Sequence, residues 1–392
     1  MSGPLSFGVC RTKYLCNSCA TTARMDIPIA DPSLDEECIE IASKTLADEY
    51  YLKGESVRLF EEEFAEFVQT EHAISVDSGT QALHLSLKAL GITEGDKVLT
   101  TPATFIATAN AIVRTGAEPV FVDIDLRNYT IDISKVREAL RQKPEISAIL
   151  PVHLYGHPVA MDELAKVAGD TPIVSDACQA HGATYSGQPL EYWSDLTAYS
   201  FYPSKNMTVA GDGGMITTDD NEVAATIRGL RDVGRKDETE NQVHDIIGYT
   251  ARLNTVNAAI GKYQLQKLDE WNERRRELAQ KYHKELDGIG DLVLPPRDNQ
   301  RESAWYVYTI RTEFRESLSR HLSSRGIETG INYDPPVHLQ PPYIKRGYGS
   351  YSFPNTEKWA ETALSIPVHQ HMTDREVTYV IEQITEFFKE EF

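Results

Sequence analysis

Between residues 73 and 217, short apolar runs alternate with helical stretches, and this alternation limits what the chain can fold into. The runs are nearly continuously apolar over three to five residues, which is typical of strands buried on both faces. Stretches with apolar residues at helical spacing lie between them. We therefore expect an α/β fold with a large, mostly parallel, seven-stranded sheet covered by helices on both faces. The expected strands are 73–76, 98–100, 119–122, 148–152, 172–174, 198–201 and 215–217, and the expected helices are 80–90, 105–115, 133–142 and 161–168.

The segments on either side of this pattern indicate a second, smaller domain. Two amphipathic helices precede the pattern and a long charged helix follows it; beyond a proline-rich linker, the chain mixes a strand with helices. In order, these segments are 35–50, 56–69, 256–286, 294–298, 305–311, 317–324 and 374–388. We predict a large domain at 56–270 and a smaller α+β domain at 271–392, with residues 25–55 packed on the small domain.

Residues 1–24 lack the long apolar core of a secretory signal. Cys16 and Cys19 have the spacing of a zinc-ligand pair, but a structural zinc site needs four ligands and the chain has no second pair. We expect a disordered leader ahead of Met25 and no metal.

The charge balance excludes some classes of partner. The chain has 59 acidic and 39 basic residues and a formal net charge of -20, whereas a protein that binds nucleic acid needs a basic face. No run reaches the roughly 18 apolar residues of a membrane span. We therefore expect a cytoplasmic protein that holds any anionic ligand by local contacts.

Three polar features lie where predicted strands end, and ligands of parallel sheets bind at that edge. Ser78, Gly79 and Thr80 open a helix, which suits a phosphate or simply an N-cap. Asp176 is suited to cap a helix or to pair with a cofactor ring nitrogen. Lys205 is either a surface charge or an amine that condenses with an aldehyde. Phosphate loop, acid and then lysine is the order found in fold type I pyridoxal-phosphate (PLP) enzymes.

Longer motifs resemble the sugar aminotransferases of the DegT/DnrJ/StrS family from Met25 to Phe392. They are Ser78-Gly79-Thr80-Gln81-Ala82-Leu83, Thr104-Phe105-Ile106-Ala107-Thr108-Ala109-Asn110, Val122-Asp123-Ile124-Asp125, Pro151-Val152-His153-Leu154-Tyr155-Gly156, Asp176-Ala177-Cys178-Gln179-Ala180-His181-Gly182, Ser200-Phe201-Tyr202-Pro203-Ser204-Lys205-Asn206, Gly211-Asp212-Gly213-Gly214 and Pro336-Val337-His338-Leu339-Gln340-Pro341. The resemblance implies an aspartate-aminotransferase-like fold, PLP as cofactor and pyridoxamine phosphate as its intermediate form.

The resemblance also implies roles for single residues. Lys205 would bind PLP as a Schiff base, and Asp176 would pair with the ring nitrogen. Gln179 would lie near the ring's 3'-oxygen, and Phe105 would stack on the ring. Alternatively, Phe105 is an ordinary residue of the hydrophobic core. The phosphate contacts would come from Ser78, Gly79, Thr80 and Ser200.

The family pattern Gly-x-Asn-x-Arg, which reaches across a dimer interface, is Gly248-Tyr249-Thr250-Ala251-Arg252 in this chain. Thr250 replaces the asparagine, so its phosphate contact would come from a hydroxyl, while Arg252 matches and would bind the phosphate or the donor carboxylate. The resemblance thus implies a homodimer with two shared active sites.

The implied reaction moves an amino group from L-glutamate to a keto-sugar carried by a nucleotide. His181, Tyr333 and His338 are the candidate substrate contacts. The related sugar dehydratases carry histidine at the lysine position, and Lys205 argues against that activity. A non-nucleotide cyclic ketone as acceptor and a non-catalytic regulatory role remain alternatives. The loop Gly211-Asp212-Gly213-Gly214 resembles that of enzymes acting at C3 of the sugar.

Overall fold

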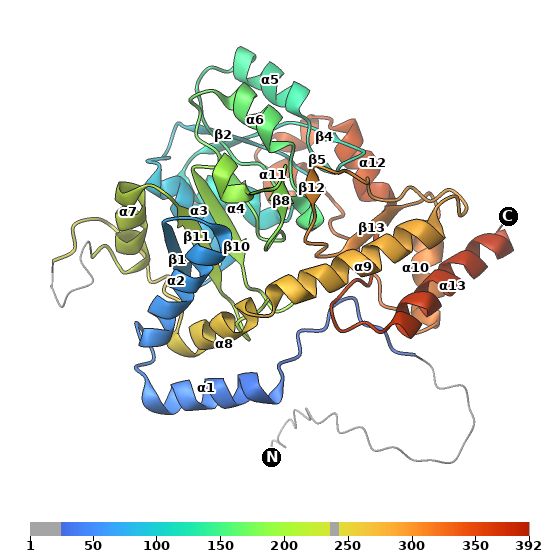
Figure 1. Ribbon diagram of the computed structural model, residues 1–392. Helices are drawn as coiled ribbons and strands as arrows, with labels where there is room; N and C mark the ends of the chain where they lie inside the picture. Colours follow the sequence, from blue (N-terminus) through green and yellow to red (C-terminus); the bar gives the residue numbers. More distant parts are fainter. Residues whose placement is uncertain (1–24, 236–242, 392) are drawn as a thin grey trace, which may run out of the picture.

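The structure is a computed structural model that describes residues 25–235 and 243–391. The predicted disordered leader, 1–24, with Cys16 and Cys19, lies outside these residues. A sheet lies at the centre of the molecule (Figure 1). Its seven strands, all among the described residues, follow the order β1-β11-β10-β7-β6-β2-β3, in which two isolated parallel bridges join β7 to β6. Neighbours are parallel except at β11, which is antiparallel to β1 and β10. The strands are β1 (His72–Val76), β2 (Lys97–Thr100), β3 (Glu118–Phe121), β6 (Ile146–Ile149), β7 (Val174–Asp176), β10 (Leu196–Ser200) and β11 (Gly214–Thr218).

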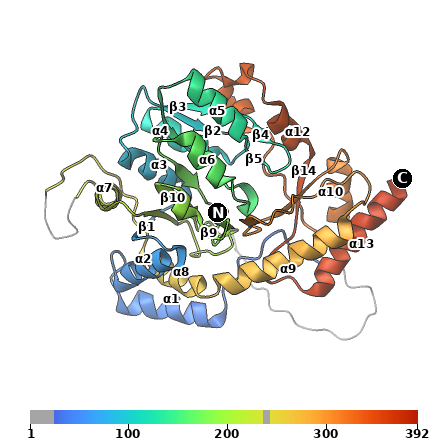
Figure 2. The same ribbon diagram turned by 45° about the horizontal axis from the view of Figure 1, so that its top comes forward.

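Helices cover both faces of this sheet, because alternate strand residues point to opposite sides. Ile74 and Val76 of β1 pack in one apolar cluster with α3, α4 and α7, whereas Ala73 packs with α2 and α8 on the other face. On that second face α5 and α6 pack side by side over β2, β3 and β6 (Figure 2). The helices are α2 (Glu55–Val68), α3 (Gly79–Ala89), α4 (Ile106–Thr115), α5 (Ile133–Gln142), α6 (Met161–Ala168), α7 (Asn221–Arg231) and α8 (Thr255–Leu265). The predicted fold class is confirmed.

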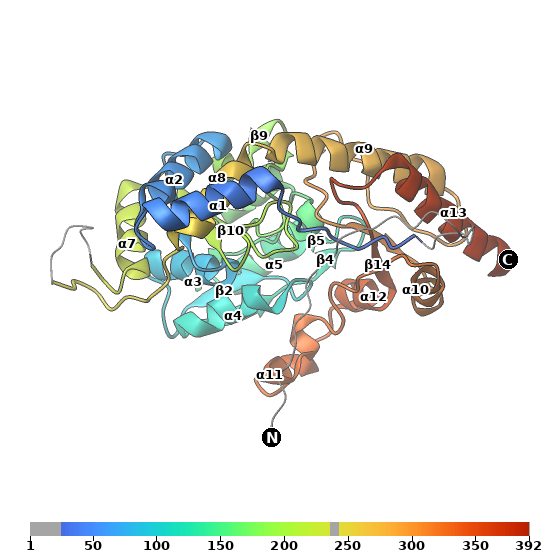
Figure 3. The ribbon, with the colours of Figure 1, turned by 90° about the horizontal axis from the view of Figure 1, so that it is seen from below.

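The C-terminal part of the chain has its own apolar cluster, built on the antiparallel pair β13–β14 and the helices α9, α10 and α13. Ile27 belongs to this cluster and pairs with Ile327. By contrast, α1 (Glu36–Asp48) packs against α8, as Figure 3 shows from below. The C-terminal elements are α9 (Leu268–Leu286), β13 (Tyr308–Arg311), α10 (Arg315–Ser324), α11 (Pro341–Ile344), α12 (Pro354–Thr362), β14 (Ala363–Ile366) and α13 (Asp374–Glu391). Short strands are β4 (Ile124–Asp125), β5 (Thr130–Ile131), β8 (Thr184–Tyr185), β9 (Gln188–Pro189) and β12 (Arg301–Glu302).

Two expected elements differ from the structure. The helix expected at 256–286 is divided into α8 and α9, because the Lys267 N–H turns back to the Gln264 carbonyl in a tight turn. The strand expected from residue 305 begins at Tyr308, because Trp305 has a φ of 47° and a strand requires negative φ. None of the described helices is long and apolar enough to cross a membrane.

Candidate active site

The N-terminus of α3 forms an anion-binding turn at the carboxyl edge of the sheet. The Ser78 hydroxyl caps the helix by accepting a hydrogen bond from Gln81 N at 3.2 Å. The N–H groups of Gly79 and Thr80 lie in the first turn, where no intrahelical carbonyl can accept them and the helix dipole is positive. Gly79 approaches β10 so closely that a Cβ would lie 2.5 Å from the Ser200 Cβ. The glycine thus lets the turn close into a cup that fits a phosphate.

Asp176 ends β7 with a buried carboxylate, only 5% exposed. It accepts hydrogen bonds from Thr108 Oγ1 at 2.7 Å and from Cys178 N at 3.2 Å. Across residues 25–235 and 243–391, no cationic side chain forms an ion pair with it. Burial raises the pKa of the Asp176 carboxyl. The nearby Lys205 amine lowers this pKa, but burial outweighs it. A buried carboxylate with no ion pair is costly, so a cationic ligand atom beside it would be stabilised.

Lys205 lies on the loop after β10, and its neighbour Asn206 anchors that loop. The buried Asn206 amide donates hydrogen bonds to Asn272 Oδ1 at 2.8 Å and to the Ala304 carbonyl at 2.7 Å. The Lys205 amine points at the ring of Tyr306, 4.3 Å from its centroid. Within the described ranges the amine makes no hydrogen bond or ion pair. It is therefore available to a ligand in the cavity.

Aromatic and amide side chains complete the site. Phe105 is half exposed, and its ring lies 5.4 Å from that of Tyr333, which comes from the C-terminal part of the chain. Gln179 is held from both sides, because its Oε1 accepts from Tyr155 N at 2.7 Å and its Nε2 donates to Tyr333 Oη at 3.0 Å. The amide is thus oriented before any ligand binds.

These side chains line one cavity of about 460 Å³, a volume suited to a small cofactor. The predicted site residues that the structure brings together there are Ser78, Gly79, Thr80, Phe105, Asp176, Gln179, Ser200, Lys205 and Tyr333. Sequence reasoning missed Tyr306 and the role of Thr108. Thr108 follows Phe105 by three positions on the predicted helix, so helical spacing would have placed it on the same face. No local signal marks Tyr306.

Two of the predicted substrate contacts lie outside the cavity lining. His181 is 1% exposed and packs against the rings of Tyr199 and Phe201, with centroids 5.3 and 5.8 Å away. Burial lowers its pKa to about 3, so the ring is neutral. His338 is also buried, beside Phe353, and its Nε2 lies 3.4 Å from Glu357 Oε1. Burial lowers the pKa of His338, although Glu357 opposes that shift.

Thr250 and Arg252 also lie away from the cavity within this chain. Arg252 forms an ion pair with Asp232, which Lys53 also contacts, and Thr250 is exposed and paired with Asp232 through the backbone. Burial of Asp232 is outweighed by the hydrogen bonds from Lys53 and Arg252, so the pKa of its carboxyl is below the ordinary value. Both residues were expected to act across a subunit interface.

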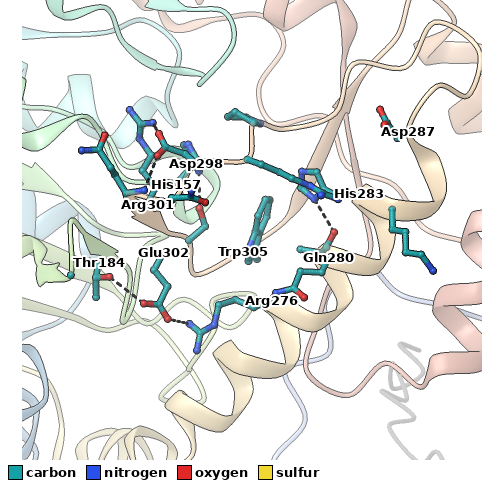
Figure 4. A pocket seen from close by; sticks show the side chains of 18 residues that line it. His157, Thr184, Arg276, Gln280, His283, Asp287, Asp298, Arg301, Glu302 and Trp305 are labelled. Atoms are coloured by element: carbon teal, nitrogen blue, oxygen red, sulfur yellow. Dashed lines mark hydrogen bonds and ion pairs between the residues drawn. The ribbon is translucent and has the colours of Figure 1, made fainter.

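A second cavity, of about 920 Å³, lies between α9 and the segment before β13 (Figure 4). It is larger, but no predicted site residue lines it. Charged side chains around it pair with one another: Arg276 Nη1 lies 3.0 Å from Glu302 Oε1, and Arg301 forms an ion pair with Asp298. We therefore assign the chemistry to the smaller cavity, where the amine and the buried carboxylate meet.

The residues of the smaller cavity fit PLP. The cup at α3 matches a phosphate, Asp176 matches a protonated ring nitrogen, and the Lys205 amine matches an aldehyde carbon. None of the described residues groups into a metal-binding cluster. Fold and site together define a fold type I PLP-dependent enzyme.

Comparison with known proteins names the family. Residues 32–385 match the DegT/DnrJ/EryC1/StrS aminotransferase family, and the chain belongs to it. It is 40% identical over 366 residues to the erythromycin biosynthesis sensory transduction protein EryC1 of Saccharopolyspora erythraea, covering 91% of this chain and 98% of that protein. It is 38% identical to the dTDP-3-amino-3,4,6-trideoxy-alpha-D-glucose transaminase of Streptomyces venezuelae, covering 93% and 95%.

Solved structures agree. The crystal structure of ntda from Bacillus subtilis with bound cofactor PMP superimposes with a TM-score of 0.86 at 28% identity, covering 93% of this chain and 85% of that one. The predicted family, aminotransferase activity and cofactor are confirmed.

Proposed function

We propose that this aminotransferase moves an amino group from L-glutamate to the keto group of a nucleotide diphosphate sugar. The observation that carries the proposal is the Lys205 amine in one cavity with the buried Asp176 and the N-terminus of α3. The Streptomyces venezuelae relative, named for a dTDP-linked 3-amino sugar, supports the substrate class and the carbon C3. Gly211-Asp212-Gly213-Gly214 supports the same carbon by resemblance.

Each residue has a separate task in this proposal. When bound, PLP supplies an electron-withdrawing ring that stabilises negative charge at the donor Cα. Lys205 would hold the cofactor covalently, and its free amine would carry a proton between the donor Cα and the cofactor. Asp176 would keep the ring nitrogen protonated. In the second half of the reaction, Lys205 would deliver a proton to the acceptor sugar carbon.

The remaining cavity residues bind and orient. The Gly79 and Thr80 N–H groups with the hydroxyls of Ser78 and Ser200 hold the phosphate. Phe105 covers one face of the ring, and Gln179 meets the 3'-oxygen with its orientation set by Tyr155 and Tyr333. Of the three predicted substrate contacts, Tyr333 is the one in the cavity lining, and we propose it as the contact to the sugar.

We also propose a homodimer with shared sites. Tyr50 and Ile247 are large apolar side chains that are 88% and 92% exposed in the single chain. Lys53, three residues after Tyr50, forms an ion pair with Asp232, and Asp232 bridges to Thr250, three residues after Ile247. Mixed dimers test this. Lys205→Ala and Arg252→Ala chains should each be inactive alone, and mixing them should restore up to about a quarter of the activity, because one of two sites is intact in half of the dimers. If mixing restores nothing, shared sites are refuted.

The primary test is the absorption spectrum of the purified protein with PLP, before and after L-glutamate. A band near the visible edge that glutamate moves to shorter wavelength supports the first half-reaction, and Lys205→Ala should bind PLP without that response. Nucleotide keto-sugars and free cyclic ketones are then offered as acceptors. Turnover with the free ketones alone would replace the nucleotide-sugar proposal.

A regulatory role without catalysis is the second candidate, favoured by the name of the Saccharopolyspora erythraea relative. It predicts a protein whose absorption spectrum does not respond to glutamate. Cytoplasmic location and the domain limits 56–270 and 271–392 remain predictions, which cell fractionation and limited proteolysis test directly.

A further inference from the structure

The Lys205 amine rests on an aromatic ring. Its Nζ lies 4.3 Å from the centroid of Tyr306, within the range of a cation–π contact. The same ring is tied to the lysine loop, because the Tyr306 hydroxyl lies 2.9 Å from Ser204 Oγ, next to Lys205 in sequence. The Tyr306 N–H also donates to the Tyr155 carbonyl at 3.0 Å. Ring, hydroxyl and backbone of Tyr306 are therefore all fixed beside the amine.

A buried arginine holds the segment that carries Tyr306. Arg275 on α9 is 3% exposed, and its Nη1 donates to the carbonyls of Trp305 at 3.0 Å, Tyr306 at 3.2 Å and Val368 at 2.7 Å. Its Nη2 donates to Gln370 Oε1 at 2.7 Å. Among the residues that the structure describes, no carboxylate forms an ion pair with Arg275. Burying a guanidinium that only carbonyl oxygens accept from is energetically costly. The buried Arg275 therefore suggests a specific role in the structure.

The backbone between these contacts turns sharply. Trp305 has a φ of 47°, an uncommon conformation for a bulky side chain. As a result, the Trp305 ring points into the larger cavity (Figure 4), while the next side chain, Tyr306, lines the active-site cavity. The carbonyls that Arg275 grips belong to these two residues. Arg275 thus stabilises the backbone turn that orients the Tyr306 side chain.

We propose that Tyr306 is a positioning residue for the catalytic lysine, and that Arg275 positions Tyr306 through the carbonyls of Trp305 and Tyr306. The ring face holds the amine in place until the cofactor or substrate replaces this contact. The contact itself is independent of the proposed reaction, whereas its effect on turnover rests on the proposed function.

The test measures the Lys205 amine in the cofactor-free protein. An amine-reactive acetylating ester is added, and acetylation of the peptide with Lys205 is followed by mass spectrometry against the exposed Lys345 as reference. Tyr306→Leu should speed acetylation of Lys205 about five- to tenfold, since the amine loses the ring against which it rests. Tyr306→Phe keeps the ring and should stay within about twofold of the wild type. Equal rates in Tyr306→Leu and wild type, or equal acceleration in both variants, overturn the proposal.

Arg275 is tested against a neighbour on the same helix. Arg275→Lys keeps the charge but loses the planar guanidinium that donates to several carbonyls at once. It should therefore accelerate acetylation of Lys205, as Tyr306→Leu does. Arg276→Lys is the matched control, because Arg276 faces the larger cavity and pairs with Glu302, and it should leave the rate unchanged. Equal acetylation rates in Arg275→Lys and Arg276→Lys would refute the proposal that Arg275 positions Tyr306. If Arg275→Lys does not fold, the Tyr306 pair of variants decides alone.

A second readout links the contact to catalysis. In the single-turnover reaction of the PLP-loaded protein with L-glutamate, Tyr306→Leu should lower the limiting rate constant about tenfold and change the half-saturating glutamate concentration less than about twofold. A change confined to the half-saturating concentration would make Tyr306 a substrate-binding residue and refute positioning. If no variant or wild type reacts with glutamate, the proposed function fails while the acetylation result still stands.

Discussion

Asp176→Asn should make the cofactor-free protein more stable and the enzyme much weaker. The carboxylate is 5% exposed and has two hydrogen-bond donors, Thr108 Oγ1 and Cys178 N, but no ion-pair partner within the described residues. An amide of the same shape carries no charge to desolvate. We expect a gain of about 1–3 kcal/mol in the free energy of unfolding at neutral pH.

The size of the chain sets the measurable shift. Unfolding entropy is about 2.1 cal/mol/K per residue, so 392 residues give about 0.8 kcal/mol/K. A gain of about 1–3 kcal/mol then raises the Tm by about 1–4 °C. With PLP present, the same substitution should be unfavourable, because it removes the negative charge that pairs with the ring nitrogen. A lost charge pair of about 4 kcal/mol corresponds to about a 10³-fold loss in cofactor affinity or turnover.

The pH dependence gives an independent check. Burial raises the pKa of Asp176, so the folded state resists its ionisation. The destabilisation is fully present above that raised pKa and disappears below the unfolded value of about 3.9. The Tm of Asp176→Asn and wild type should therefore converge towards pH 4 and below.

Differential scanning calorimetry of the cofactor-free proteins measures these shifts, with Asp125→Asn as the control. Burial of Asp125 is outweighed by hydrogen bonds from Arg127, so the pKa of this carboxyl is below the ordinary value. The same substitution there should lower the Tm at neutral pH. If Asp176→Asn also lowers the Tm, the buried carboxylate is not an uncompensated charge and our reading of the site is wrong.

Three further substitutions test the fold and the site. In Gly79→Ala the new Cβ would lie 2.5 Å from the Ser200 Cβ, so PLP affinity in equilibrium dialysis should fall at least about tenfold with the circular dichroism unchanged. Burial raises the pKa of Glu191 from 4.5 to about 7, so wild type should lose stability relative to Glu191→Gln as the pH rises through that window, and parallel Tm curves would contradict this. Trp359→Ala removes a fully buried ring and its bond to Tyr155 Oη, and should cost about 3–5 kcal/mol in urea unfolding.

The sequence predicted the parts of the site that follow from local order. Asp176 and Ser200 are the last residues of β7 and β10, and Ser78 caps the helix after β1. Parallel strands bring their carboxyl ends to one edge, so positions far apart in the chain meet without further information. Helix breaks were less predictable, because the turn at Lys267 interrupts a stretch whose apolar spacing continues across it.

The orientation of histidines shows what sequence cannot decide. His181 follows Asp176 closely, yet its ring turns into the core against Tyr199 and Phe201. His338 likewise lies in a buried position next to Phe353. The direction of the side chain decides whether a histidine ring lies in the cavity or in the core. The spacing of apolar residues in the sequence does not predict that direction.

By itself the sequence determined the alternating sheet and helices, the order of phosphate cup, acid and lysine, and through them the class of enzyme. Only the tertiary structure decided which distant side chains complete the cavity. Tyr306 and Tyr333 come from the C-terminal part of the chain, and Arg275 on α9 donates to the carbonyls of Trp305 and Tyr306. The reason is physical: strand and helix patterns depend on neighbours in sequence, whereas these contacts depend on how separately formed elements pack.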